Sequence, residues 1–174
     1  MSTLPEIRHS RVADAAAIAR FLGDNFIVAY GHCSTPENVR AHVAGVFSRE
    51  RLATELAAHE YLALVAAADD GTVAGVTQLA FATPTPECVV DPAVELRRFY
   101  VAPEWHGSGL ADALMTRTLE LAAPRGRNVW LSVWEKAPRA VAFYRRNGFA
   151  VAGRAKFVIG EDAQDDWVMS RTIA

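Results

Sequence analysis

The sequence predicts an α/β fold in which helices come first and helices and strands later alternate. Three observations support this prediction. Apolar residues recur at helical spacing in the first third of the chain, short apolar runs bounded by turn residues follow, and extended and helical segments alternate in the second half. No repeat, linker or shift in composition divides the 174 residues, so we expect one domain over residues 1–174.

The N-terminal third is predicted to be helical. Val12, Ala15, Ala19, Leu22 and Phe26 follow one another at steps of three and four, which predicts an amphipathic helix over residues 12–26. A second helix is expected from residues 34–37, where cap residues adjoin a proline suited to a first helical turn, to residues 46–47. A short third helix is expected at about residues 48–58.

The rest of the chain is predicted to consist of strands that are joined by turns, loops and helices. Two runs, residues 61–67 and 72–81, flank an Asp-Asp-Gly turn and predict a β-hairpin. The prolines at 84 and 86 mark a loop, because proline lacks the amide donor that a central strand needs. Further strands are expected at 94–101, 127–134, 149–157 and 166–173, and further helices at 107–123 and from about 136 to the Asn-Gly pair at 147–148.

The overall composition excludes several classes of protein. Hydrophobic residues make up 51% and charged residues 22%, which suits a folded core rather than a disordered chain. A net charge of -2 argues against a nucleic-acid-binding surface. The longest apolar run, residues 61–68, is too short to span a membrane. We therefore expect small-molecule partners, with no nucleic acid and no membrane.

Neither a metal site nor a targeting segment is expected. The histidines and the two cysteines, Cys33 and Cys88, show no metal-ligand or redox spacing. Residues 1–7 have no basic segment followed by an apolar one, so no secretory signal is predicted and a cytoplasmic location is expected.

The segment most informative about chemistry joins the strand at 94–101 to the next helix. Gly107 and Gly109 allow a ligand to approach the backbone closely, and the first amides of the helix lack intrahelical acceptors. Free amides and the positive end of the helix dipole favour an anion such as phosphate. A purely structural turn is the alternative. No Lys-Ser/Thr pair follows the glycines, which argues against a P-loop.

Two segments resemble one family. His106-Gly-Ser-Gly-Leu-Ala111 is similar to the acyl-CoA motif of the GNAT acetyltransferases, Arg/Gln-x-x-Gly-x-Gly/Ala, and departs from it at His106. The segment from Leu131 to Phe149 is similar to the family's Leu-x-Val…Asn-x-x-Ala-x-x-Phe-Tyr-x-x-x-Gly-Phe, with Ala137 in the place of asparagine. Further segments, including Tyr30-Gly-His and residues 160–169, look like the PaiA branch, a group associated with polyamine acetylation.

The resemblance implies a fold and a cosubstrate. The expected fold is a central mixed, mostly antiparallel sheet that splays at the cofactor site and is flanked by helices. Acetyl-CoA is the expected cosubstrate, and the resemblance allows a homodimer. The residues expected to bind acetyl-CoA are Phe99, Tyr100, Val101, His106, Gly107, Ser108, Gly109, Leu110, Ala111, Ala137, Arg139, Phe143 and Arg146.

The resemblance also assigns roles in catalysis. Tyr144 matches the tyrosine that gives a proton to the departing thiolate, although its helical position also suits core packing. Glu95 is the candidate general base; the alternatives are a salt bridge to Arg97 or Arg98 and a water relay without a dedicated base. Phe26, Tyr30 and Trp134 are candidates for the wall of the acceptor pocket, with core packing as the alternative.

An acidic group lies near the C-terminus. Glu161, Asp162, Asp165 and Asp166 are expected either to attract a polyamine or to form a solvated turn.

The predicted function is transfer of an acetyl group from acetyl-CoA directly to a primary amine, with a polyamine or another small amine as the expected acceptor. A protein N-terminal or lysine acetyltransferase and a non-catalytic acyl-CoA-binding regulator are the alternatives.

Overall fold

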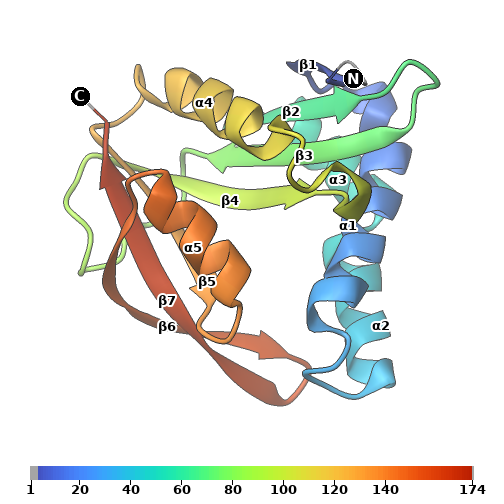
Figure 1. Ribbon diagram of the computed structural model, residues 1–174. Coiled ribbons are helices and arrows are strands. Elements are labelled where there is room, and N and C mark those ends of the chain that lie inside the picture. The colour runs from blue at the N-terminus through green and yellow to red at the C-terminus, as the bar shows by residue number, and fades with distance from the viewer. Residues whose placement is uncertain (1–3, 174) are drawn as a thin grey trace.

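The computed structural model describes residues 4–173 and is built around one twisted sheet (Figure 1). Residues 1–3 and 174, part of the expected domain, lie outside the described residues. The strands are β1 (Glu6–His9), β2 (Tyr61–Ala67), β3 (Val73–Ala80), β4 (Ala93–Val101), β5 (Asn128–Trp134), β6 (Ala150–Ile159) and β7 (Asp162–Thr172). The helices are α1 (Ala15–Tyr30), α2 (Pro36–Val46), α3 (Arg49–Ala57), α4 (Leu110–Ala122) and α5 (Pro138–Arg146), with short 3-10 turns η1 (Val12–Asp14) and η2 (Pro103–Trp105).

The strand order is β1-β2-β3-β4-β5-β7-β6, and every neighbouring pair is antiparallel except β4 and β5. A parallel pair needs a crossover connection, which α4 supplies here. The pairing of β4 with β5 extends only from Ala93↔Asn128 to Glu95↔Trp130. Beyond that point the two strands diverge, as Figure 1 shows. The predicted splayed, mixed and mostly antiparallel sheet is therefore confirmed.

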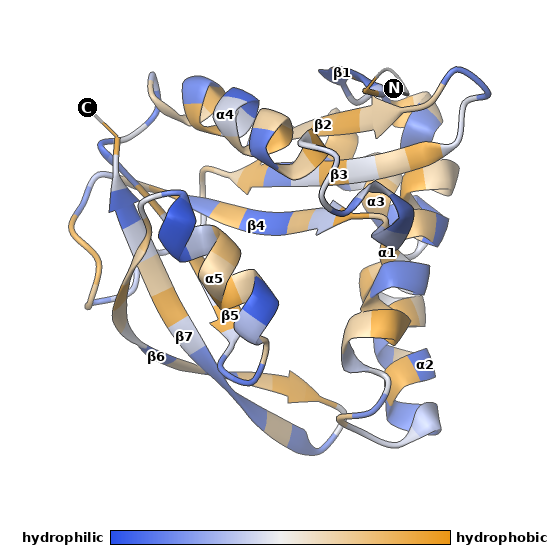
Figure 2. Cartoon of the chain, in the orientation of Figure 1, coloured by the Kyte–Doolittle hydropathy of each residue, from blue (hydrophilic) through white to orange (hydrophobic). Residues whose placement is uncertain are grey.

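A register shift decides which side chains of β4 face which helices. The shift lies opposite Gln78 and Leu79, so Arg97 is the extra residue of a bulge. After the bulge, Tyr100 packs in the core beneath α1, whereas Phe99 and Val101 pack beside Leu110 and Leu114 of α4. Figure 2 shows the alternation of apolar and polar residues along this strand. The end of β4 therefore presents different groups to the two faces of the sheet.

Two cores lie on opposite faces of the sheet. One contains Phe21, Leu22 and Phe26 of α1 together with Val65 and Val76 of the sheet. The opposite core lies beneath α4 and α5. It contains Leu110, Leu114 and Met115 of α4, which are fully buried, and the side chain of Tyr144 from α5. Burial of an apolar side chain stabilises the fold by about 1.5–3 kcal/mol. These cores hold α1 and α5 on either side of the opening between β4 and β5.

Four elements differ from expectation. Helix α4 begins at Leu110 rather than at Gly107, because Gly107 and Gly109 have positive φ and form the turn before it. The short edge strand β1 was not predicted because its sequence, Glu-Ile-Arg-His, carries too few apolar residues to show an alternating pattern. Helix α1 continues to Tyr30, beyond the predicted end at Phe26. Strand β7 begins at Asp162 rather than at Asp166, because Gly160, with φ of +63°, turns the chain so that Asp162 pairs with Ile159. Within residues 4–173, no helix has the length and apolarity of a membrane span.

Candidate active site

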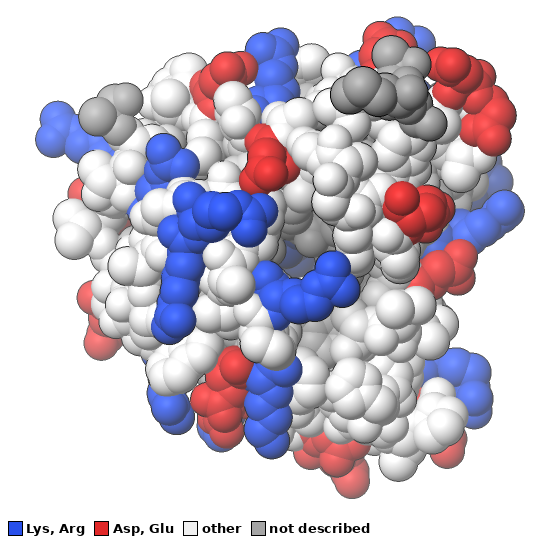
Figure 3. Space-filling view, in the orientation of Figure 1, with Lys and Arg blue, Asp and Glu red and all other residues white. Residues whose placement is uncertain are grey.

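The candidate site begins where β4 and β5 separate. Glu95 and Trp130 form the last pair between these strands, and β4 then continues to Val101 and β5 to Trp134 without a partner on the facing edges. Figure 3 shows a hollow near the middle of this face, with Lys or Arg side chains at its edge. An extended ligand with amide groups can pair with these strand edges as an additional strand would.

The turn that follows β4 exposes backbone donors. Gly107 and Gly109 have φ of +80° and +93°, and a Cβ at either would meet no atom within 4 Å. In the described part of the chain, the N–H groups of Gly107, Gly109 and Ala111 have no hydrogen-bond acceptor. The N–H of Ser108 donates to Trp105 instead, and that of Leu110 to the Ser108 hydroxyl. The turn therefore offers three free amides to an anion, whereas the N–H groups of Ser108 and Leu110, two other residues expected to bind acetyl-CoA, are already paired.

Two arginines of α5 lie close to this turn. Arg139 Nη2 lies 3.3 Å from His106 Nδ1, and His106 Nε2 lies 3.0 Å from the Val101 carbonyl oxygen. This geometry fits Arg139 donating to Nδ1 while Nε2–H donates to Val101. Arg146 forms an exposed ion pair with Asp112 in the first turn of α4, at 3.3 Å. The open glycines, free amides and two guanidinium groups fit the phosphates of acetyl-CoA.

Tyr144 projects from α5 into the core beside the opening. Its ring contacts those of Phe99, Phe143 and Phe149, and the residue is 9% exposed. Burial raises the pKa of the Tyr144 hydroxyl above its ordinary value, so the group keeps its proton at neutral pH. Among residues 4–173 this hydroxyl has no hydrogen-bond partner. A protonated phenol without a partner can donate to a ligand that enters the opening.

Ala137 and Phe143 also border this part of the structure. Phe143 packs against Phe99 with ring centroids 5.3 Å apart, which links α5 to β4. Ala137 is the N-cap of α5 and has no side-chain cap hydrogen bond, while its own N–H donates to the Trp134 carbonyl at 3.0 Å. An asparagine at this position would supply a cap that alanine cannot.

Glu95 lies at the fork between the two strands and is partly buried. Its Oε2 accepts a hydrogen bond from the Thr83 hydroxyl at 2.5 Å and lies 3.7 Å from Arg97 Nη1. Arg98, the other expected partner, forms a buried ion pair with Glu55 instead. Burial raises the pKa of Glu55, but hydrogen bonds and charge from Arg98 outweigh this effect and hold it below the ordinary value. Arg98 therefore pairs with Glu55 in the core and not with Glu95. Of the two expected salt bridges of Glu95, the one to Arg97 is present.

The predicted acceptor wall lies on the α1 face. The Tyr30 ring lies 6.0 Å from Trp134 of β5 and 4.8 Å from Phe26, measured between centroids. Phe26 is 2% exposed and stacks on His42, so it supports Tyr30 from behind. His32, which was not predicted as a site residue, lies 5.5 Å from the Trp134 ring. The accessible part of this wall is formed by Tyr30, His32 and Trp134.

The four acidic residues near the C-terminus do not form one cluster. Asp162 accepts hydrogen bonds from Ser34 and Asn38. Asp165 pairs with Lys156 at 2.5 Å, and Glu161 is exposed in the hairpin turn. Asp166 is 6% exposed, and burial together with the charge of Asp165 raises its pKa to about 6. Successive side chains of a strand point to opposite faces of the sheet. A prediction that included both residues in β7 would therefore have placed Asp165 and Asp166 on opposite faces.

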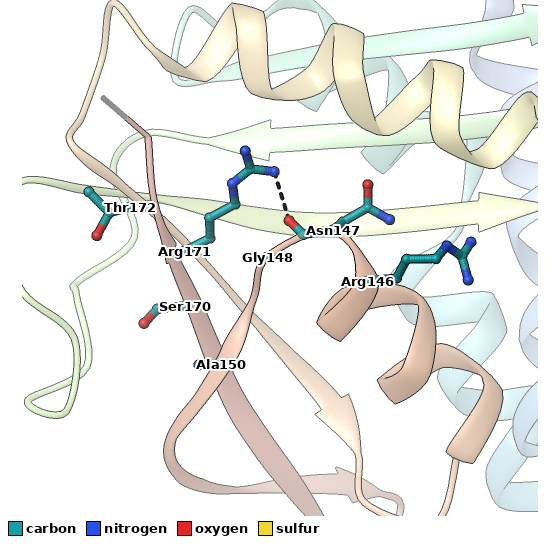
Figure 4. Close-up of a pocket in the computed structure, with 7 residues that line it drawn as sticks. All are labelled: Arg146, Asn147, Gly148, Ala150, Ser170, Arg171 and Thr172. Atoms are coloured by element: carbon teal, nitrogen blue, oxygen red, sulfur yellow. Dashed lines mark hydrogen bonds between the residues drawn. The ribbon is translucent and has the colours of Figure 1, made fainter.

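A cavity of about 710 Å³ lies at the C-terminal end of α5 and shares only Arg146 with the predicted site (Figure 4). It is lined by Arg146, Asn147, Gly148, Ala150, Ser170, Arg171 and Thr172. Arg171 donates to the Asn147 carbonyl at 2.7 Å, whereas the side chain of Arg146 extends to the other side of the α5 end. Of the predicted residues only Arg146 touches this cavity, so we place the chemistry at the strand opening. Within the described residues, no group of three or more His, Cys, Asp or Glu could hold a metal ion.

Comparisons with known proteins identify the family of this chain. Residues 15–149 match the Acetyltransferase (GNAT) family. The chain is 33% identical over 168 residues to an uncharacterized N-acetyltransferase of Mycobacterium tuberculosis, covering 93% of this chain and 99% of that protein. A PaiA N-acetyltransferase from Thermoplasma acidophilum, solved with coenzyme A, has a TM-score of 0.78 at 20% identity, covering 99% of this chain and 100% of that one.

A second solved structure is a spermidine N-acetyltransferase chimera from Vibrio cholerae and hSSAT. Its TM-score is 0.68 at 20% identity, and the match covers 98% of this chain and 96% of that one. At such identities the two structures show a shared fold, whereas the family match covers most of the chain. The protein belongs to the GNAT family and is an N-acetyltransferase that uses acetyl-CoA as its cosubstrate.

Proposed function

We propose that this enzyme transfers the acetyl group directly to a primary amine of a small cationic molecule, and that polyamines are its leading substrate class. One observation carries the proposal: the protonated hydroxyl of Tyr144 on the α5 face and an aromatic, acidic surface on the α1 face lie beside the same opening. The pKa of Tyr30 is raised mainly by burial, and Tyr100, Asp166 and Tyr144 add to this effect. Each of these three groups is therefore within electrostatic reach of Tyr30.

The proposed cofactor site follows from the turn and α5. Acetyl-CoA supplies the activated thioester. The free amides of Gly107, Gly109 and Ala111 are proposed to hold the diphosphate, and the guanidinium groups of Arg139 and Arg146 the remaining phosphate. The unpaired edge of β4 at Phe99 and Val101 is proposed to pair with the pantetheine amides. His106 orients the turn through Val101.

The proposed chemistry needs three proton movements. The ammonium group must lose one proton before its nitrogen attacks the thioester carbon, the nitrogen must lose a second proton to solvent as the amide forms, and the departing sulfur must gain one from a donor that solvent then reprotonates. Glu95, at the fork and held by Thr83, is the proposed proton acceptor, through water. The Tyr144 hydroxyl is the proposed donor to sulfur, because burial keeps it protonated. The attack breaks the carbon–sulfur bond as the amide bond forms, and no acetylated residue is required.

The surface beside this site favours a small amine. Tyr30 and Trp134 supply ring faces that attract a cation, and Asp166 supplies a buried carboxylate. The PaiA N-acetyltransferase and the spermidine N-acetyltransferase chimera share the fold, which is consistent with a place in the PaiA branch. A peptide substrate is the alternative that the test must exclude.

An amine panel tests the proposal. Thiol release from acetyl-CoA is measured with spermidine, putrescine, benzylamine, a peptide with a free N-terminus and a peptide with an internal lysine. We expect kcat/KM to be at least about 10-fold higher for the polyamines than for the peptides, with N-acetylated products seen by mass spectrometry. A preference for either peptide would overturn the small-amine assignment. Thiol release that no amine increases would overturn the proposed transfer to these amines.

A further inference from the structure

Asp166 is a buried carboxylate that forms no ion pair with any side chain of residues 4–173. Its Oδ1 atom is fully enclosed and has no hydrogen-bond partner among the described residues. The cations of the adjoining strand β6 are used elsewhere, because Lys156 pairs with Asp165 and Arg154 pairs with Glu135. An unpaired charge is costly to bury, so its presence needs an explanation. A ligand that carries a positive charge would supply one.

The position of Asp166 fits such a ligand. In the sheet it lies between Trp134 of β5 and Ala155 of β6. Trp134 in turn contacts Tyr30, so the carboxylate belongs to the aromatic surface of the acceptor side. Asp166 acts on the pKa values of both Tyr30 and Tyr100, which border the opening from α1 and β4. The carboxylate therefore lies near the reaction centre and on the face away from α5.

The chemistry of transfer decides which nitrogen the carboxylate binds. The attacking nitrogen must become neutral, and contact with a carboxylate would stabilise its charged form instead. A second nitrogen on the same molecule keeps its charge throughout the reaction. We infer that Asp166 binds this second, non-reacting ammonium group and thereby selects diamines and polyamines over monoamines. This inference rests on the proposed function and specifies its substrate class.

Paired substrates test the inference. Putrescine and butylamine have the same carbon chain and differ in the second amino group. In the native enzyme we expect kcat/KM to be at least about 10-fold higher for putrescine, the size of effect typical of a charge-assisted hydrogen bond. In Asp166→Asn this preference should fall to about twofold or less, with the KM for acetyl-CoA unchanged within about twofold.

Asp165→Asn is the matched control, because it removes the same charge from the neighbouring residue, which points away and pairs with Lys156. It should keep the preference for putrescine. Thermal unfolding checks that each variant is folded, and Asp166→Ala replaces Asp166→Asn if the latter does not fold. Equal putrescine preference in the native enzyme and in the folded variant would overturn the inference, as would the absence of any preference in the native enzyme.

A binding measurement separates this inference from the proposed function. Putrescine is titrated calorimetrically into the CoA-loaded native enzyme and into the CoA-loaded Asp166 variant. We expect the dissociation constant to rise by about 10-fold or more in the variant. If no amine is acetylated but putrescine still binds through Asp166, the transfer proposal fails and the Asp166 assignment stands. If amines are acetylated and putrescine binding is unchanged in the variant, the Asp166 assignment fails alone.

Discussion

The side chain of Tyr144 has a ring that packs in the core and a hydroxyl that we propose as the proton donor. Its ring fills a space between Phe99, Phe143 and Phe149, while its hydroxyl has no hydrogen-bond partner in the described part of the chain. Burial raises the pKa of this phenol, so the hydroxyl is protonated at neutral pH and can donate a hydrogen bond. The ring and the hydroxyl can be tested separately, because phenylalanine retains the first and removes the second.

Tyr144→Phe should lower kcat far more than it weakens CoA binding. General acids contribute on the order of 10²–10⁴-fold to rate, and thiolate is a good leaving group, so we expect a loss of about 100-fold in kcat. The dissociation constant for CoA should change by less than about threefold. Steady-state kinetics and calorimetry measure the two quantities, and Tyr61→Phe on β2 is the control. Comparable losses in both would mean that Tyr144 acts mainly through packing.

Burial of the Asp166 carboxylate lowers the free energy of unfolding when the group is ionised. Its pKa is raised to about 6, so the folded protein holds the proton more tightly than the unfolded chain does. The penalty is absent below the ordinary pKa of an aspartate and develops fully as the pH rises through 6. Asp166→Asn should therefore increase the free energy of unfolding by about 1–2 kcal/mol at pH 8, with little gain at pH 3.5.

Thermal unfolding at the two pH values measures this effect. Asp165→Asn is the control of opposite sign, because the hydrogen bond from Lys156 lowers the pKa of Asp165. That variant should be no more stable than the native protein at pH 8. Destabilisation of Asp166→Asn at pH 8 would indicate that the carboxylate has a stabilising partner, contrary to the structure.

At the scale of elements, the turn between β4 and α4 depends on two glycines. Gly109 is the N-cap of α4 with φ of +93°, a conformation that costs other residues about 1–2 kcal/mol. A side chain there would point into the space that we assign to phosphate. Gly109→Glu should raise the dissociation constant for CoA by at least about 10-fold, because it adds bulk and negative charge.

Gly71→Glu is a matched control for backbone strain. Gly71 also has positive φ and open space around its Cβ position, but it lies in the hairpin between β2 and β3. Both variants should lose a similar amount of stability, measured by denaturant unfolding, and only Gly109→Glu should lose CoA affinity by calorimetry. Unchanged affinity in Gly109→Glu would remove the cofactor from this turn.

The elements differ in how well the sequence predicts them. Helices α1, α2 and α5 and the β2–β3 hairpin have strong local signals: helical spacing, caps and a turn between apolar runs. Strand β1 has too short a pattern, and β7 begins with acidic residues that resemble a solvated turn. The sequence names Asp166 among the acidic residues but does not predict its burial, because that burial depends on the register with β5 and β6, which is set by contacts distant in sequence.

The residues of the candidate site also differ in how much the sequence says about them. The motif glycines and Tyr144 could be proposed from the sequence because their neighbours in sequence carry the pattern. The alternatives for Glu95 could be narrowed only in three dimensions, where Arg98 pairs with Glu55 from α3 and Thr83 binds the carboxylate from a loop. Side chains whose partners come from remote elements give no periodic signal.

At the scale of the molecule, the site is assembled from segments far apart in the chain. The proposed site takes Tyr30 from α1, Glu95 from β4, Tyr144 from α5 and Asp166 from β7, around the opening that is left because β4 and β5 pair over only part of their length (Figure 1). A ligand in the opening would contact both halves of the sheet. Its binding free energy should therefore stabilise the folded chain as a whole.

CoA should consequently raise the melting temperature. At a free concentration of about 100 times its dissociation constant, a ligand that binds only the folded state adds about 2.7 kcal/mol. For a domain of this size each kcal/mol corresponds to about 2–4 °C, so we expect a rise of about 5–10 °C by differential scanning fluorimetry. Tyr144→Phe should keep the full shift and Gly109→Glu should lose it at the same CoA concentration, because one change affects the chemistry and the other the binding of phosphate. A shift that is equally large in Gly109→Glu would show that CoA is held elsewhere in the fold.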